Sequence, residues 1–218
     1  MQLRLLEKDG VYHVCTKSIA GFTIFNNDRE FLRMLETIQY YQVQDTPVCF
    51  SYCETHKKIK QNIETSNKEK IFEIVAYCLM PTHFHLIAQQ VTEKWISRAL
   101  SNILNSYTKY FNKKHNRKGP LWVGRFKSVT VNDDDQLLHL SRYLHLNPVT
   151  ANLVKRPEDW QWSSYGEYLL ADKETRKICK FKELIDIEPA AYKKFVDDRI
   201  DEQRKLAKIK SIILEDPY

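Results

Sequence analysis

The sequence predicts an α+β fold of the ferredoxin-like class, an antiparallel sheet with helices on one face, followed by a helical C-terminal extension. Segments that alternate like β-strands lie between segments whose apolar residues recur at helical spacing. Their order is strand, helix, three strands and then helices, a variant of the β-α-β-β-α-β arrangement of that class. Hydrophobic residues are 43% of the 218 positions and charged residues 28%, a balance that allows a buried core.

The first elements follow from local patterns in the N-terminal third. Residues 11–16 alternate and predict a strand, whereas residues 28–42 carry apolar side chains at helical spacing and predict a helix. Residues 48–52 are rich in β-forming side chains and predict a short strand. Residues 57–70 are polar and basic without an apolar period, so we expect a loop there.

Two neighbouring strands are expected next. Residues 71–79 form a strongly apolar strand, Met80-Pro81-Thr82 interrupts it, and residues 83–88 alternate again. A helix with Thr92 as its N-cap is predicted over 92–112, and residues 119–131 are expected to be extended.

A further helix is predicted over residues 133–147. Asn132 or Asp133 would cap its start, and Pro148 would stop it. The predicted domain covers residues 1–168, and residues 169–218 form the helical C-terminal extension, whose role the sequence does not reveal.

Composition narrows the classes of partner and compartment. Lys and Arg number 34 against 28 Asp and Glu, and this basic excess permits a nucleic-acid partner. The five cysteines are odd in number and lack Cys-x-x-Cys spacing, which argues against a disulfide framework or a zinc knuckle. No apolar stretch approaches the roughly 20 residues of a membrane span, and the N-terminus lacks a signal-peptide core. We therefore expect a cytoplasmic protein without a membrane partner.

Two histidines stand two apart on the strand predicted over 83–88. His83 and His85 therefore leave the same face, with Phe84 on the other. Paired imidazoles can make half of a divalent metal site. The spacing alone is a weak signal, and the alternative is two half-exposed histidines beside a core phenylalanine.

A polar stripe runs along the helix predicted over 133–147. Tyr143 and Asn147 are four residues apart and share a face, to which His139 and Gln136 also belong. Leucines on the adjoining arc can dock the helix on the sheet. The alternative is that Tyr143 packs like most tyrosines and that Asn147 only ends the helix.

Residues 109–127 carry seven Lys or Arg and no acidic residue, interleaved with aromatic side chains. Such a composition suits a surface that follows phosphates and stacks unpaired bases, although a solvated helix end and loop would look similar. The predicted DNA-binding residues are Lys113, Lys114, Arg117, Lys118, Arg125 and Lys127.

Five sequence blocks in this order resemble the HUH-type single-tyrosine transposases (IS200-like), and within them the REP-associated tyrosine transposase branch. They are Ala76-Tyr-Cys-Leu-Met-Pro-Thr-His-Phe-His-Leu-Ile87, Tyr107-Thr-Lys-Tyr-Phe-Asn112, Gly119-Pro-Leu-Trp-Val-Gly-Arg-Phe-Lys-Ser128, Arg142-Tyr-Leu-His-Leu-Asn-Pro-Val149 and Trp162-Ser-Ser-Tyr165. The resemblance extends over about residues 12–165. Where the family often has Arg-Gly after its first strand, this chain has Cys-Thr-Lys after Val14.

The resemblance implies specific roles. His83 and His85 would be metal ligands, with Asn147 as the third, and Tyr143 would be the nucleophile. The cofactor would be Mg²⁺ or Mn²⁺, and the substrate single-stranded DNA with a hairpin. His139, one turn from Tyr143, is a candidate for activating the phenol. Relatives act as monomers or as homodimers, with the tyrosine in cis or in trans.

Two other classes of function remain at this point. A non-catalytic ferredoxin-like module that binds nucleic acid would need neither the metal nor Tyr143. A metal-dependent nuclease would use His83 and His85 but activate water instead of the phenol.

Overall fold

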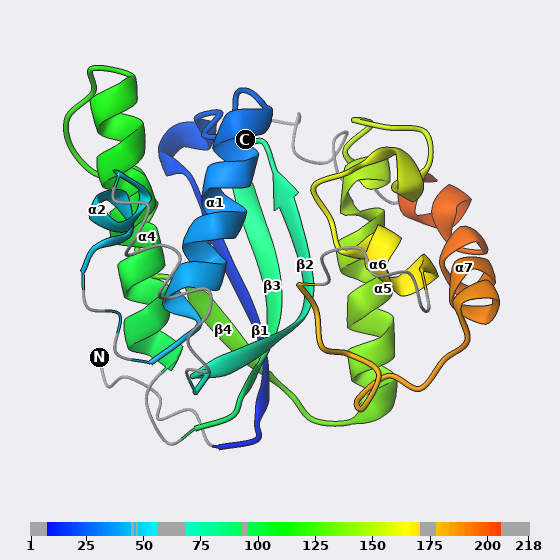
Figure 1. Cartoon of the computed structure of the whole chain (residues 1–218). Helices are drawn as coiled ribbons and strands as arrows, with labels where there is room; N and C mark the ends of the chain where they lie inside the picture. The colour runs from blue at the N-terminus through cyan, green and yellow to red at the C-terminus, as the bar shows by residue number, and fades with distance from the viewer. Residues whose placement is uncertain are drawn as a thin grey trace, which may run out of the picture. The chain divides into compact units, whose positions relative to one another are not determined.

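The computed structural model describes residues 8–44, 46, 48–55, 69–92, 96–170 and 178–205. Figure 1 shows the chain. Its main elements are β1 (Val11–Lys17), α1 (Asp28–Tyr41), α2 (Phe50–Thr55), β2 (Phe72–Met80), β3 (His83–Gln90), α4 (Ile96–Lys114), β4 (Lys127–Val131), α5 (Asp134–Thr150), α6 (Tyr165–Leu169) and α7 (Pro189–Asp197). Single 3₁₀ turns occur at Ile19–Gly21 and Pro157–Asp159.

The four strands form one antiparallel sheet in the order β2-β3-β1-β4. The connection of β2 to β3 is a tight turn at residues 81–82, so these strands are direct neighbours. Strand β1 then pairs with β3, and β4 closes the other edge. This order, with α1 after β1 and α4 after β3, is that of a β-α-β-β-α-β ferredoxin-like domain, so the predicted fold class is confirmed.

Contacts divide the chain into two compact units, which we describe separately. Unit 1 comprises Met1–Glu73, Pro81–Phe84 and Ala88–Thr130. Unit 2 comprises Ile74–Met80, His85–Ile87 and Val131–Tyr218. The proposed division at residue 168 stays a prediction.

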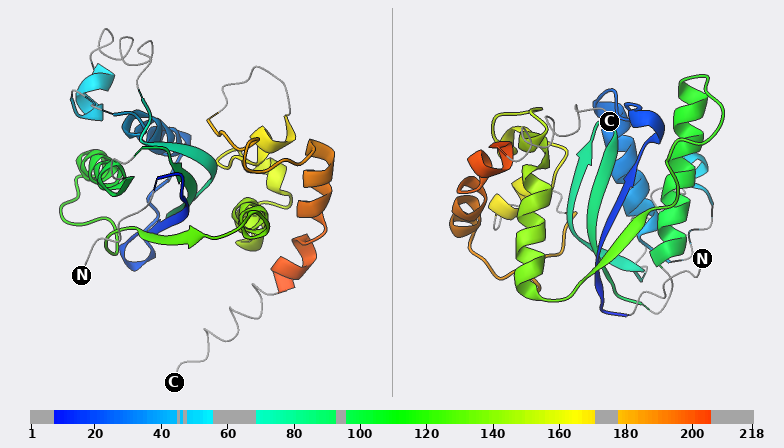
Figure 2. Two further views of the ribbon diagram at one scale, coloured as in Figure 1. Left: turned by 90° about the horizontal axis from the view of Figure 1, so that it is seen from below. Right: turned by 180° about the vertical axis from the view of Figure 1, so that it is seen from behind.

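In unit 1, α1 and α4 pack against each other on one face of the sheet (Figure 2). The alternation of β1 buries Tyr12 and Val14. From α4, the buried Tyr107 hydroxyl donates a hydrogen bond to the Ile24 carbonyl at 2.6 Å. The two helices are also joined by the carboxylate of Glu30, which is fully buried.

Glu30 receives three sets of polar contacts. Its Oε1 lies 2.8 Å from Lys114 Nζ and 2.7 Å from His115 Nε2, while Oε2 accepts hydrogen bonds from the backbone and side chain of Asn26. Burial by itself would raise the pKa of Glu30, but the hydrogen bonds from Lys114, Asn26 and His115 outweigh it and lower the pKa to about 2. The ionised carboxylate therefore ties the start of α1 to the end of α4.

The strand predicted over residues 48–52 is wrong, because Phe50 begins helix α2. Short apolar runs cannot be assigned to strand or helix by periodicity. Tertiary contacts decide the conformation of this segment. Phe50 is buried, its ring centroid lies 5.1 Å from that of Tyr40, and the Arg33 guanidinium lies 4.2 Å from the Phe50 ring centroid.

Pro148 does not stop α5, which continues to Thr150. A proline lacks the N–H that would bond the carbonyl one turn back, so it is disfavoured in a helix interior. Here it lies in the last turn, and the helix closes beyond it through Ala151 N–H to Asn147 O and Leu153 N–H to Pro148 O. The predicted cap is confirmed, since the Asp133 carboxylate accepts from the Gln136 N–H at 2.7 Å.

Other predicted boundaries have mixed outcomes. The predicted loop over 57–70 lies outside the described residues except for its last two positions, and the predicted start of the 92–112 helix adjoins residues 93–95, also outside them. Helix α4 is confirmed from Ile96 onward. Of the extended segment predicted over 119–131, only Lys127–Val131 is a strand.

Unit 2 contains a fully buried polar network that fixes α5. His145 Nδ1 lies 2.7 Å from the Tyr192 hydroxyl of α7, and His145 Nε2 lies 2.8 Å from Ser164 Oγ. The Tyr192 hydroxyl also lies 2.8 Å from Ser141 Oγ, and Ser164 Oγ accepts from the Tyr77 N–H of β2. Burial lowers the pKa of His145 to about 3, so this imidazole is neutral at physiological pH.

Residues after 177 pack into unit 2. The Lys180 N–H donates to the Ile74 carbonyl of β2 at 2.7 Å. The Phe181 ring stacks on the Tyr168 ring with 3.7 Å between the ring centroids. The Glu167 carboxylate accepts hydrogen bonds from the Ile178 and Cys179 N–H groups. Together with Tyr192, these contacts make the C-terminal residues part of the unit that carries α5.

Glu30→Gln should lower the free energy of unfolding by about 2 kcal/mol at pH 7, because charge-assisted hydrogen bonds are lost. The folded-state pKa is depressed, so this stabilisation exists above about pH 4.5 and disappears as pH falls toward about 2. Urea unfolding of wild type and variant at several pH values measures the difference in the free energy of unfolding. The difference between wild type and variant should vanish near pH 2, whereas Asp186→Asn, at an exposed carboxylate, should change little at any pH. A pH-independent difference would contradict the assignment.

Tyr192→Phe should destabilise the protein by about 1–3 kcal/mol, because it leaves the buried Nδ1 of His145 unpaired and removes one of the two hydrogen bonds of the Ser141 hydroxyl. Tyr165→Phe is the matched control. The Tyr165 side chain is equally buried, but among the described residues its hydroxyl has no hydrogen-bond partner, so its removal should be neutral or slightly stabilising. Equal losses in thermal denaturation would show that the network does not stabilise unit 2.

Candidate active site

Strand β3 carries the histidine pair. His83 is half-buried and His85 is 8% exposed, whereas Phe84 between them is 1% exposed and packs edge-on against Trp122 at 6.0 Å between ring centroids. Because side chains alternate along a strand, Phe84 enters the core of unit 1 while both imidazoles leave the opposite face. The predicted strand thus places the pair as its sequence pattern requires.

His83 is held in its neutral form. Burial, with a smaller effect from the charge of Lys17, lowers the pKa of His83 to about 4. Thr82 Oγ1 lies 3.0 Å from His83 Nδ1. A neutral imidazole keeps a nitrogen lone pair for a metal ion, and a hydrogen bond at one ring nitrogen selects which nitrogen that is.

Tyr143 lies on α5 beside His85. The two ring centroids are 5.9 Å apart with an interplanar angle of 88°, so the contact is edge to face. Tyr143 is 43% exposed, unlike the deeply buried Tyr107, Tyr165 and Tyr192. A packing role therefore does not account for this side chain, and its phenol is open to a large substrate.

Asn147 follows one turn after Tyr143 on α5. It is 9% exposed, and its Nδ2 has no hydrogen-bond partner among the described residues. Amide nitrogen and oxygen exchange places on a 180° turn of the group. A buried, unsatisfied amide on the face that carries Tyr143 suits a side chain that ligates a cation through its oxygen.

His139 has contacts on its own helix and on α7. Its Nδ1 lies 2.7 Å from an Arg142 guanidinium nitrogen, its Nε2 lies 3.6 Å from Asp135, and its ring meets Phe195 at 5.4 Å. The described contacts of the His139 imidazole are thus with Arg142, Asp135 and Phe195.

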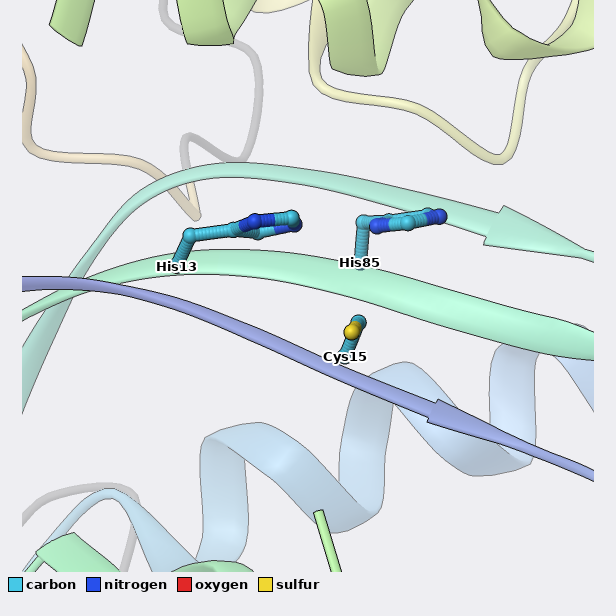
Figure 3. A group of neighbouring side chains, drawn as sticks. All are labelled: His13, Cys15 and His85. Atoms are coloured by element: carbon cyan, nitrogen blue, oxygen red, sulfur yellow. The ribbon is translucent and has the colours of Figure 1, made fainter. Parts of the chain in front are cut away.

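A group that could hold a metal ion consists of His13 and Cys15 of β1 and His85 of the neighbouring β3 (Figure 3). One donor atom from each lies within 4.8 Å of the others. A thiol with two imidazoles is a donor set for softer divalent ions such as Zn²⁺, which differ from Mg²⁺. Burial raises the pKa of Cys15, so an ion there would have to displace a proton from the thiol.

Sequence reasoning missed His13 and Cys15. Both lie on the strand that was correctly predicted over 11–16, and their spacing of two places them on one face. The same alternation that singled out His83 and His85 would have identified them.

The predicted DNA-binding residues fall into two groups, those with partners inside unit 1 and those exposed to solvent. Lys114 is paired with Glu30, and Arg117 donates to the carbonyl oxygens of Gly119 and Pro120, so both hold unit 1 together. The other four side chains are exposed: Lys113, Lys118, Arg125 and Lys127. In the described residues, no helix is long and apolar enough to cross a membrane.

Comparison with known proteins identifies a family model and a relative that this chain resembles. Residues 49–147 match the family model described as "Transposase IS200 like". The chain is 29% identical over 111 residues to a protein of Haemophilus influenzae named as a REP-associated tyrosine transposase. That match covers 46% of this chain and 63% of the relative, so the chain spans less than two thirds of its length.

A solved structure shares the fold. It is that of a REP-associated tyrosine transposase bound to a REP hairpin, with a TM-score of 0.53 and 18% identity, covering 86% of this chain and 98% of the other. Residues 49–147 thus match the IS200-like transposase family, and the resemblance of the chain to the REP-associated tyrosine transposases is confirmed.

Proposed function

We propose that this protein is a single-tyrosine transposase, a metal-dependent enzyme that cuts and rejoins single-stranded, hairpin-bearing DNA through a 5′-phosphotyrosine on Tyr143. The contact between Tyr143 and His85, 5.9 Å between ring centroids, carries the proposal. It brings an exposed phenol to a histidine of the pair, as the chemistry requires.

The ligands we propose for the metal are His83, His85 and the amide oxygen of Asn147. The neutral state of His83 and the unsatisfied buried amide of Asn147 fit that role. Two nitrogens and one oxygen leave positions for phosphate and water, and suit Mn²⁺ or Mg²⁺. When bound, such an ion polarises the phosphate and favours in-line attack.

The phenol of Tyr143 performs the covalent step. Its oxygen forms a bond to phosphorus while the bond from phosphorus to the 3′ oxygen breaks, and the leaving oxygen takes a proton to become a 3′-OH. A phenol, with a pKa of about 10, forms its anion more readily than water. A second 3′-OH can later attack the phosphotyrosine, which restores the DNA bond and frees Tyr143 without ATP.

His139 is proposed as a group that takes the phenol proton, on the ground that it lies one turn before Tyr143 on α5. Its hydrogen bond to Arg142 sets its present orientation. Because the Arg142 guanidinium occupies the lone pair of Nδ1, a proton can be taken at that nitrogen only after this hydrogen bond breaks. The role of His139 is therefore separate from the proposal for Tyr143.

The proposed substrate is DNA because exposed positive charge is concentrated in residues 113–127, from the end of α4 to the start of β4. Lys113, Lys118, Arg125 and Lys127 are exposed and lie within one stretch that lacks acidic residues. Such side chains neutralise phosphates without regard to sequence. The solved relative bound to a REP hairpin supports a folded single strand as the preferred form.

A cis arrangement is proposed for the active site. His85 and Tyr143 of one chain are already in contact, so a second copy is not required to supply the phenol. A homodimer remains compatible with this arrangement if each copy holds a complete site.

Tyr143→Phe should abolish a covalent protein–DNA adduct while leaving hairpin binding nearly unchanged, because only the hydroxyl is removed. The adduct is measured by denaturing electrophoresis after incubation with labelled single-stranded hairpin DNA and Mn²⁺. Tyr52→Phe, at another exposed tyrosine, is the control and should keep the adduct. Cleavage without any adduct in the wild type would favour a water-activating nuclease, and binding without cleavage would favour a non-catalytic module.

His83→Ala combined with His85→Ala should eliminate both DNA cleavage and high-affinity Mn²⁺ binding. Electron paramagnetic resonance of the free Mn²⁺ measures the binding. Hairpin binding in EDTA should remain within a few-fold of wild type, because these imidazoles serve the ion rather than the DNA backbone. Equal loss of DNA binding and cleavage would instead assign the pair to DNA contact or folding.

Mixing this double variant with Tyr143→Phe also tests the cis arrangement. No adduct should form, because neither chain has both the phenol and the metal ligands. Recovery of adduct in the mixture would show that Tyr143 acts on the metal site of a second copy.

A further inference from the structure

Unit 1 contains a pocket of about 650 Å³ between α4 and residues 120–126. One wall is the outward face of α4, where the lining residues recur at helical spacing: Ser97, Arg98, Ser101, Asn105 and Thr108. The other wall includes Trp122, Arg125 and Phe126. The volume lies in the range of about 300–1,000 Å³ that is typical of small-ligand sites.

The second wall is fixed before any ligand binds. The Leu121 carbonyl accepts from the Ile19 N–H at 2.9 Å, and the Val123 N–H donates to the Lys17 carbonyl at 3.0 Å. The Trp122 indole N–H reaches back to the Leu104 carbonyl of α4 at 3.2 Å. The pocket is therefore preformed, which lowers the entropic cost of binding.

The polar lining selects the charge of a ligand. Ser101 and Thr108 use their hydroxyl hydrogens on α4 carbonyls one turn back, so toward the pocket they can only accept. The side-chain donors that remain are the exposed Arg98, Asn105 and Arg125 and the hydroxyl of the buried Ser97. No carboxylate lines the pocket, and no described salt bridge engages either arginine. These features favour an anionic ligand.

We propose that this pocket binds one unpaired nucleotide of single-stranded DNA. Arg98 and Arg125 hold its phosphates, Asn105 bonds the edge of its base, and the half-buried Phe126 offers a ring for stacking. An amide and an aromatic ring beside two guanidinium groups match a nucleotide better than a free inorganic anion. The inference rests on the proposed function, because it presupposes single-stranded DNA as the substrate.

The test measures equilibrium binding by the full chain carrying Tyr143→Phe, so that cleavage does not interfere. Fluorescence anisotropy compares a labelled hairpin oligonucleotide with a set in which one unpaired position at a time is abasic. Removing the base that occupies the pocket should weaken binding roughly tenfold, the size of one base–aromatic stacking contact. An abasic position elsewhere should have little effect, because the phosphates are unchanged.

Phe126→Ala and Asn105→Ala should each bind the intact DNA more weakly and lose the discrimination between intact and abasic DNA. Ser101→Trp, which fills the pocket from an exposed helix position, should do the same. Arg29→Ala, at an exposed cation of α1 outside the pocket, is the control and should keep the discrimination. Thermal melting confirms that each variant is folded.

Equal binding of every abasic oligonucleotide by the unsubstituted pocket would overturn the inference. So would discrimination that survives Phe126→Ala, Asn105→Ala and Ser101→Trp. These outcomes are distinct from a failure of the proposed function, which would appear as a missing Tyr143 adduct in the cleavage assay while nucleotide discrimination could persist.

Discussion

The two-residue repeat of β3 is the constraint on which the candidate site depends. A strand sends alternate side chains to opposite faces. Phe84 is anchored in the core of unit 1 against Trp122, so a slip of one residue would turn both imidazoles into that core and Phe84 to the opposite face of the sheet. The packing of one apolar ring thereby fixes the direction of His83 and His85.

The second requirement is a firmly placed α5. The buried contacts of His145 with Tyr192 and Ser164 join this helix to α7 and to the segment that pairs with β2. These atoms are two residues from Tyr143 along the chain, so they fix the helix that carries the phenol while leaving the phenol exposed. C-terminal residues that the sequence left without a role thus support the tyrosine helix.

Local patterns predicted the strands and the long helices well, because alternation and helical spacing are properties of neighbouring residues. The prediction failed where a distant contact decided the outcome. Phe50 became helical against Tyr40 and Arg33, and Pro148 was tolerated because later backbone bonds close the helix after it. Arg117 and Lys114 could not be separated from the DNA-facing cations by sequence, since their partners are formed by folding.

By itself, the sequence determined the ferredoxin-like class, the strand that carries His83 and His85, and the common helix face of Tyr143 and Asn147. Only the tertiary structure decided that the Tyr143 ring meets His85, that His139 turns to Arg142, and that β1 brings His13 and Cys15 near His85. The physical reason is that periodicity sets the face from which a side chain projects. Which side chains then meet across elements depends on long-range packing, which no local pattern encodes.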